Sequence, residues 1–293
     1  METSLAKQSS TTALDGLIDV SASRTVPEYL ADLWRLRNFM AEVPRADLRA
    51  RNMNTLLGNV WYLVSPLLQV GVYFLVFGEI LGVDRGLQNF LGYLTIGVFL
   101  FRYSQQCAIA GAKSLTTNEG LIKSIRFPRA VLPISAVTAE TLALVPALGV
   151  AIVITILTGE AIEARWLLFI PYVALLVMFT MGIAFITARL NEMFRDIQNI
   201  LPIFFRLTFY LSGILYSIDR FTAEPDTPQW VLNVARLFPF NPWYSLITLA
   251  KSSILAEVDA PPEIWISAVS WSIVALIGGF LLFKAGESTY GRN

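Results

Sequence analysis

Six apolar stretches constrain what this chain of 293 residues can fold into. Each approaches or exceeds the roughly 20 residues that a helix needs to cross a bilayer. Lipid offers no partners to backbone polar groups, and a helix satisfies its own. The sequence therefore predicts an all-α membrane protein with six transmembrane helices. The expected spans are residues 60–81, 91–112, 131–158, 166–188, 198–217 and 264–284.

The composition agrees with this fold class and narrows the function. Hydrophobic residues make up 55% of the chain and charged residues 15%, whereas soluble domains hold about one quarter charged residues. The net charge of zero argues against a nucleic-acid partner. The absence of histidine excludes histidine-based catalysis and the common zinc sites, and Cys107, the one cysteine, forms no internal disulfide. Without a Walker A loop or paired carboxylates, we expect no enzyme, no metal and no directly bound cofactor.

Charge asymmetry orients the spans. With the N-terminus inside, the inner segments hold 15 of the 22 lysines and arginines and the outer segments hold 5, while Arg102 and Arg206 fall within spans. Positive charge favours the cytoplasmic side. We therefore expect a multi-pass protein of the cytoplasmic membrane with both termini in the cytoplasm. The six-span domain covers 58–285 and a C-terminal tail covers 286–293.

Two regions lie outside the simple span count. After a flexible tail at 1–28, residues 29–57 are amphipathic, which predicts a cytoplasmic interfacial helix, although a solvated charged tail is the alternative. In the outer segment 218–263, a possible helix cap precedes Pro228 and another precedes Pro242. Two short re-entrant or gate helices are expected there, and a plain outer loop with surface helices is equally compatible. The charged residues expected on the interfacial helix are Arg45, Asp47, Arg49 and Arg51.

Two expected spans carry a polar stripe at helical spacing, which is too polar to face lipid. Aromatic rings stack on the C–H faces of sugars, and amides and hydroxyls bond to sugar hydroxyls, so the two stripes suit a carbohydrate conduit. Ordinary helix packing is the alternative. The stripe on the first span is Tyr62, Ser65, Gln69 and Tyr73, and the stripe on the fifth is Arg206, Tyr210, Gly213 and Ser217.

Arg102 and Glu140 lie at similar depths in the second and third spans. Ionisable groups in hydrocarbon are costly and usually find a partner. We expect a buried ion pair between them, with a structural role favoured over contact with the substrate.

The loop at 113–130 is basic and partly apolar. A short helix there would transmit motion from a cytoplasmic partner, but composition alone favours a simple positively charged anchor. The residues in question are Asn118, Leu121, Ile122 and Lys123.

Four motifs in order resemble the membrane subunit of bacterial polysaccharide-exporting ABC transporters of the type-2 exporter fold. They extend over most of the chain from about residue 30 to 285. The motifs are Asp47-Leu48-Arg49-Ala50-Arg51 followed by Leu57-Gly58, Trp61 and Pro66; Leu121-Ile122-Lys123 followed by Phe127-Pro128-Arg129 and Pro133; Arg195-Asp196-Ile197; and Asn241-Pro242. More narrowly, the chain is similar to mycobacterial galactan exporter permeases.

The chain also departs from the family pattern. Asn52 stands where the family often has a tyrosine, Lys251 where an arginine is usual, and Gly213 where the fifth span often has a proline. The last departure leaves the shape of the fifth span open.

The resemblance implies a non-catalytic homodimeric permease bound to two separate ATPase subunits, which supply ATP and Mg. It implies that the 113–130 loop contacts the ATPase and that a lipid-linked polysaccharide is the cargo, with membrane lipid around the spans. One competing hypothesis is a drug or small-lipid exporter of the same fold. Another is a glycosyltransferase or flippase that works alone, which would need acidic catalytic residues or ion-coupled residues at the midplane.

Overall fold

A computed structural model describes residues 26–36, 40, 60–82, 87–124, 127–218, 227–287 and 290, excepting the side chains of Val26, Leu30, Asp32 and Tyr62. The chain divides into two compact units, Met1–Leu36 and Arg37–Asn293.

The described part of the first unit is one amphipathic helix, α2, which runs over Val26–Arg35. An acidic residue, Glu28, lies in its first turn and a basic residue, Arg35, in its last, and both charges suit the helix dipole. Trp34 is 70% exposed. The helix begins inside the region predicted as a flexible tail at 1–28. The four charged residues predicted for an interfacial helix, Arg45, Asp47, Arg49 and Arg51, lie outside the described residues.

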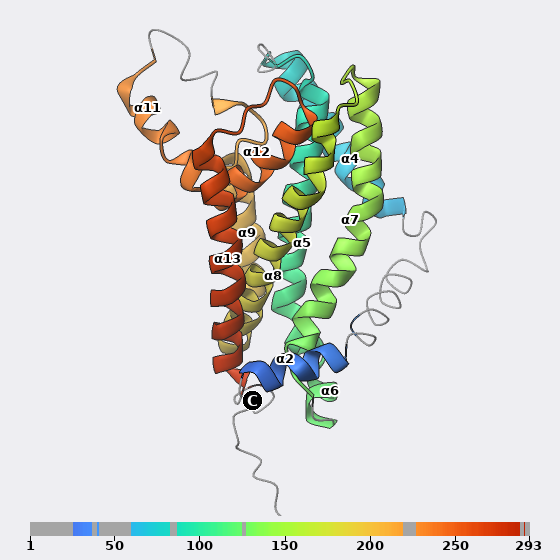
Figure 1. Cartoon of the computed structure of the whole chain (residues 1–293), viewed down its shortest axis with the longest axis vertical. Coiled ribbons are helices and arrows are strands. Elements are labelled where there is room, and N and C mark those ends of the chain that lie inside the picture. The colour runs from blue at the N-terminus through green and yellow to red at the C-terminus, as the bar shows by residue number, and fades with distance from the viewer. Residues whose placement is uncertain are drawn as a thin grey trace, which may run out of the picture. The chain divides into compact units, whose positions relative to one another are not determined.

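The described part of the second unit is helical, with no strand (Figure 1). Its elements are α4 (Trp61–Tyr73), η2 (Phe74–Ile80), α5 (Phe90–Thr117), α6 (Glu119–Ser124), α7 (Val131–Leu157), η3 (Ala164–Leu168), α8 (Phe169–Met193), α9 (Ile197–Tyr210), α11 (Gln229–Ala235), η4 (Phe238–Phe240), α12 (Pro242–Ile254) and α13 (Pro262–Ala285).

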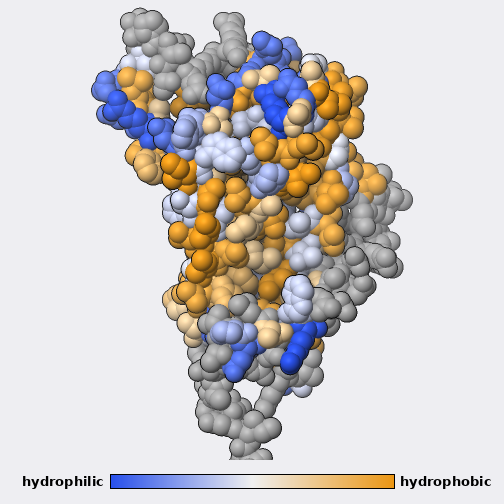
Figure 2. All heavy atoms as spheres, viewed as in Figure 1, coloured by the Kyte–Doolittle hydropathy of each residue, from blue (hydrophilic) through white to orange (hydrophobic). Residues whose placement is uncertain are grey.

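Among the described residues, four helical segments are long and apolar enough to cross a membrane: Leu63–Ile80, Val131–Leu157, Ala164–Met193 and Pro262–Ala285. Large apolar side chains such as Val145, Ile170 and Ile266 are exposed on them. Figure 2 shows such side chains over the middle of the helices, while polar residues gather at the end that carries α11. This surface suits lipid as the solvent.

Helix α5 occupies the centre of the second unit and contains the second expected span. It packs against α4, α7, α8, α9 and α12, and every residue from Gly92 to Phe101 is buried. With 28 residues, its length is about 42 Å at 1.5 Å per residue. The middle of α5 carries Arg102, Gln105 and Gln106. Because other helices cover α5 on several sides, these polar groups are partly buried against protein.

The fifth expected span is shorter than predicted. Helix α9 has 14 residues and ends at Tyr210, about 21 Å at the standard rise. Gly213 follows with φ at +58°, a left-handed conformation that glycine adopts freely. The expectation that one helical face continues from Arg206 to Ser217 is therefore wrong, because the helix stops before the turn.

Helix α12 begins as the sequence predicts. The Asn241 side chain accepts hydrogen bonds from the backbone N–H groups of Trp243, at 3.0 Å, and Tyr244, at 3.4 Å, and Pro242 takes the first helical position. Most of α12 is buried, and it packs against α5, α8 and α13. It is therefore part of the helical core rather than a surface helix on a loop.

The described residues of the segment predicted as a C-terminal tail, 286, 287 and 290, pack against the bundle. The Glu287 carboxylate accepts a hydrogen bond from the backbone N–H of Arg129 at 2.9 Å. The buried Tyr290 hydroxyl donates to the Phe283 carbonyl at 2.7 Å, and burial raises the pKa of Tyr290. The first bond joins the segment after α13 to the start of α7, and the second holds that segment against α13.

Candidate functional site

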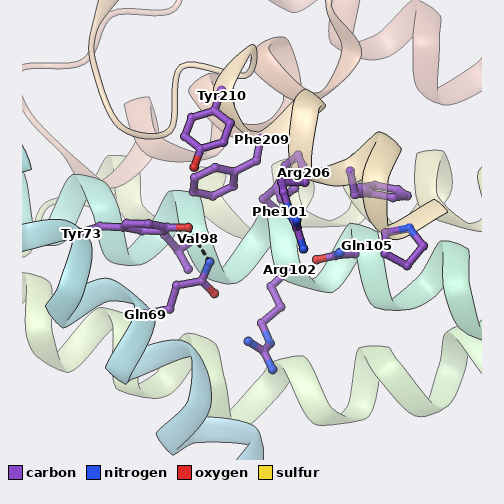
Figure 3. Close-up of a pocket in the computed structure, with 11 residues that line it drawn as sticks. Gln69, Tyr73, Val98, Phe101, Arg102, Gln105, Arg206, Phe209 and Tyr210 are labelled. Atoms are coloured by element: carbon purple, nitrogen blue, oxygen red, sulfur yellow. Dashed lines mark hydrogen bonds between the residues drawn. The ribbon is translucent and has the colours of Figure 1, made fainter. Parts of the chain in front are cut away.

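A cavity of about 180 Å³ lies between α4, α5 and α9 (Figure 3). Side chains from all three helices line it, so it exists only in the packed unit. The lining residues are Gln69, Tyr73, Val98, Phe101, Arg102, Gln105, Pro202, Phe205, Arg206, Phe209 and Tyr210.

Helix α4 supplies a polar wall. Gln69 and Tyr73 lie four residues apart, so they share one helical face. The Gln69 amide donates a hydrogen bond to the Tyr73 hydroxyl at 2.9 Å. The Tyr73 ring also packs against Phe209 of α9, with 5.3 Å between the ring centroids. This pairing fixes the orientation of the tyrosine and the amide at the cavity edge, as Figure 3 shows.

Aromatic rings form the contact between α5 and α9. Phe101 of α5 packs edge-on against Phe205, with ring centroids 5.8 Å apart, and against Phe209, at 5.3 Å. Edge-to-face pairs of this kind contribute about 0.5–1.5 kcal/mol beyond area burial. Rings, amides and hydroxyls therefore surround one space, a combination that suits a ligand with both C–H faces and hydroxyl groups.

The cavity brings together four of the eight residues in the two polar stripes that the sequence assigned to a conduit. Gln69, Tyr73, Arg206 and Tyr210 line it. The Tyr62 side chain lies outside the described residues. Ser65 and Ser217 are absent from the lining. The Ser65 hydroxyl instead accepts a hydrogen bond from Arg102 at 3.1 Å, and Ser217 lies beyond the end of α9.

The sequence-based reasoning missed the contribution of α5. Phe101 and Gln105 line the cavity, but the conduit was predicted from the first and fifth spans alone, and the second span was given only the pair between Arg102 and Glu140. A signal existed, because Arg102 and Gln105 lie three residues apart and so share a face.

Arg102 also lines a smaller cavity, of about 50 Å³, together with Glu140 of α7. The sequence predicts an ion pair between these two side chains. The hydrogen bond of the Arg102 guanidinium within the described residues goes to Ser65 instead. The shared cavity places the two residues near each other, and the ion pair stays a prediction.

The 113–130 loop contains the short helix α6, and an ion pair joins it to the turn before α9. The Glu119 carboxylate lies 3.3 Å from the Arg195 guanidinium and 3.8 Å from the Lys123 amine. Asn118 caps the end of α5, and its amide donates to the Ser114 carbonyl at 2.8 Å.

The two apolar residues of α6 differ in exposure. Ile122 is buried within the chain, whereas Leu121 is partly exposed. Of the two, Leu121 is the one that remains accessible to a partner.

The turn after α9 is held from two sides. The Tyr93 hydroxyl of α5 lies 2.6 Å from the Gly213 carbonyl oxygen and 3.0 Å from that of Tyr216. The fully buried Lys251 amine of α12 donates to the Gly213 carbonyl at 3.2 Å and lies 3.2 Å from the centroid of the Tyr93 ring. These bonds tie the turn at the end of α9 to α5 and α12.

Comparison with known proteins identifies relatives along most of the chain. A family model described as ABC-2 type transporter matches residues 48–250. The O-antigen export system permease protein RfbA of Klebsiella pneumoniae is 29% identical over 217 residues, which are 74% of this chain and 80% of the relative. The protein of the same name from Myxococcus xanthus is 24% identical over 264 residues, covering 89% of this chain and 97% of the relative.

A second kind of relative is more distant. The polysialic acid transport protein KpsM of Escherichia coli is 21% identical over 246 residues, which are 82% of this chain and 90% of the relative. The matched region contains α4, α5, α6, α9 and most of α12, so it includes the cavity and the α6 loop.

Proposed function

Because the chain belongs to the family of ABC-2 type transporters, we propose that it is the membrane permease of an ATP-driven exporter. Its cargo is a lipid-linked polysaccharide, of galactan or O-antigen type, that crosses the cytoplasmic membrane for cell-envelope assembly. The names of the relatives support a polysaccharide cargo, since they refer to O-antigen export and polysialic acid transport. The single observation that carries the proposal is the cavity in which aromatic rings alternate with amides and hydroxyls.

The cavity suits a sugar chain for a physical reason. Rings such as Tyr73 and Tyr210 present flat apolar faces, and Gln69 and Gln105 present hydrogen-bond donors and acceptors beside them. A sugar offers the matching C–H faces and hydroxyls. Arg206 supports a polar path, because an exposed arginine on a membrane helix is costly against lipid and usually faces a cavity, and Arg206 lines this one.

The proposed topology has six spans. They are the four apolar segments together with α5 and α9, and both termini lie in the cytoplasm. In this topology α11 and α12 lie at the outer side as gate helices, and α12 re-enters the membrane. The burial of α12 supports this arrangement, as does its side-chain link to the end of α9.

We propose that two copies of the chain face each other across this cavity, as a homodimer, and bind two ATPase subunits that hydrolyse ATP with Mg. The apolar face of α9 beside Arg206 supports the dimer: Ile203, Phe204 and Leu207 are exposed on it, and a second copy would cover them. In the same proposal α6 contacts the ATPase, and the ion pair between Glu119 and Arg195 carries its motion to α9, which lines the cavity.

Replacing Leu121 with aspartate is expected to uncouple the ATPase. The change puts a charge on the accessible apolar residue of α6, where burial against a partner would cost several kcal/mol. Export and cargo-stimulated ATP hydrolysis should both fall, measured in vesicles that contain the complex. The matched control is Thr117→Asp, which adds the same charge at an exposed position at the end of α5. An intact complex with normal coupling in Leu121→Asp would rule out α6 as the contact.

Depletion of the protein in its host tests the function as a whole. We expect a lipid-linked glycan to accumulate on the cytoplasmic side, and sugar analysis of that glycan would identify the polymer as galactan or as another chain. If no glycan accumulates and apolar drugs stimulate ATP hydrolysis, the protein is a drug or small-lipid exporter instead.

A further inference from the structure

The charge of the cavity is one-sided. Its lining contains two arginines, Arg102 and Arg206, and no aspartate or glutamate. The other polar lining residues, such as Gln69 and Gln105, are neutral. A positive potential in a space walled by apolar rings is focused, because the low-dielectric walls screen it poorly. A neutral sugar chain as cargo would not explain this excess of positive charge in the cavity lining.

The two arginines differ in how they are held. The Arg102 guanidinium donates to Ser65 and extends away from Arg206 toward a second cavity, which Glu140 also lines (Figure 3). The Arg206 side chain is exposed and points toward Gln105. Within the described part of the chain, no hydrogen bond and no ion pair involves its guanidinium. Of the two arginines in the cavity lining, Arg206 is therefore the one whose guanidinium has no polar partner among the described residues.

A guanidinium of this kind favours one class of ligand. It presents planar paired donors that match the oxygens of a carboxylate or a phosphate, and such bonds are stronger than those between neutral groups. The Gln105 amide lies beside it and offers a further donor. A neutral sugar hydroxyl would leave the charge without a counterion in a membrane-embedded cavity, which is costly.

We propose that this cavity is a binding site for an oxyanion group of the exported molecule, with Arg206 as the residue that contacts it. Two parts of such a molecule offer this chemistry: the phosphate ester of a lipid carrier and the carboxylate of an acidic sugar. The inference rests on the proposed function, because it assigns one chemical group of the cargo to one side chain of the conduit.

Binding calorimetry on the full chain in nanodiscs of neutral lipid tests the site. Four probes separate the sources: farnesyl pyrophosphate against farnesol for the lipid phosphate, and hexagalacturonate against a neutral galactose hexamer for the sugar carboxylate. The variants are Arg206→Gln, Arg206→Lys and, as a control with the same loss of charge outside the cavity, Arg236→Gln, an exposed arginine that follows α11. Thermal unfolding confirms that each variant is folded.

We expect one anionic probe to bind and Arg206→Gln to weaken it about tenfold, with partial recovery in Arg206→Lys and no change in Arg236→Gln. If Arg206→Gln loses affinity only for farnesyl pyrophosphate, the site binds the lipid phosphate. If it loses affinity only for hexagalacturonate, the site binds the sugar carboxylate. Failure of both anionic probes to bind the unmodified protein, or equal affinity in Arg206→Gln, overturns the inference. The neutral hexamer reports separately on the glycan path, because its binding should survive the loss of Arg206.

Discussion

Replacing Gly182 with leucine is expected to prevent the bundle from forming. Gly182 of α8 lies against α13, where an added Cβ would come within 2.2 Å of the Ala275 backbone, and an added Cβ at Gly279 would come within 2.3 Å of the Gly182 carbonyl oxygen. The two helices approach backbone to backbone, as small residues allow in membranes. A side chain at this point must push the helices apart, which we expect to cost about 3 kcal/mol or more.

Thermal unfolding and size-exclusion chromatography in detergent measure the effect. The matched control is Gly149→Leu in α7, where an added Cβ meets no atom within 4 Å. That change should be neutral or stabilise the helix by up to about 1 kcal/mol, because glycine is a poor helix former. A Gly182→Leu protein with the melting temperature of the unmodified chain would contradict the close approach of α8 and α13.

Replacing Tyr73 with leucine is expected to lower export about thirtyfold. The change removes a ring from the cavity wall and the hydroxyl that accepts a hydrogen bond from Gln69. Loss of the stacking face removes about 1 kcal/mol of interaction with a moving glycan, and loss of the hydroxyl costs about 1 kcal/mol more because the Gln69 amide is no longer held in place, so the total is about 2 kcal/mol. Delivery of polysaccharide to the outer side, normalised to the amount of protein in the membrane, is the measurement.

Two variants show whether the effect belongs to the cavity. Tyr73→Phe keeps the ring and removes the hydroxyl, so export should fall only about fivefold. Val72→Leu changes the adjacent residue, which is 58% exposed on another face of α4 and absent from the cavity lining, and should leave export unchanged. Normal export by Tyr73→Leu at normal protein levels would exclude this cavity as the path of the polymer.

The features that the sequence predicted well are local ones. The cap at Asn241 and the proline after it are confirmed, because a capping bond depends on residues two and three positions away. The 113–130 loop contains the short helix α6, although composition alone favoured a simple basic anchor there. The polar stripe on the first span is also real at Gln69 and Tyr73, since a helical face is a property of spacing alone.

The features that it predicted poorly depend on distant contacts. The prediction extended the fifth span to residue 217, but α9 ends at Tyr210, where the following turn is held by Tyr93 and Lys251 from other helices. The part of α5 in the cavity was missed for the same reason. Nothing within α5 itself shows that Phe101 packs against two rings of α9.

The sequence by itself determined that lipid is the solvent of this chain, because its long apolar runs can satisfy their backbone groups there only as helices. It also determined which side chains share a face of each helix. The tertiary structure decided which faces meet. The cavity joins residues of α4, α5 and α9 that are up to 141 positions apart, from Gln69 to Tyr210 (210 − 69 = 141). Contacts between residues so far apart in the sequence depend on side-chain packing between helices. The spacing of residues along one helix does not predict that packing.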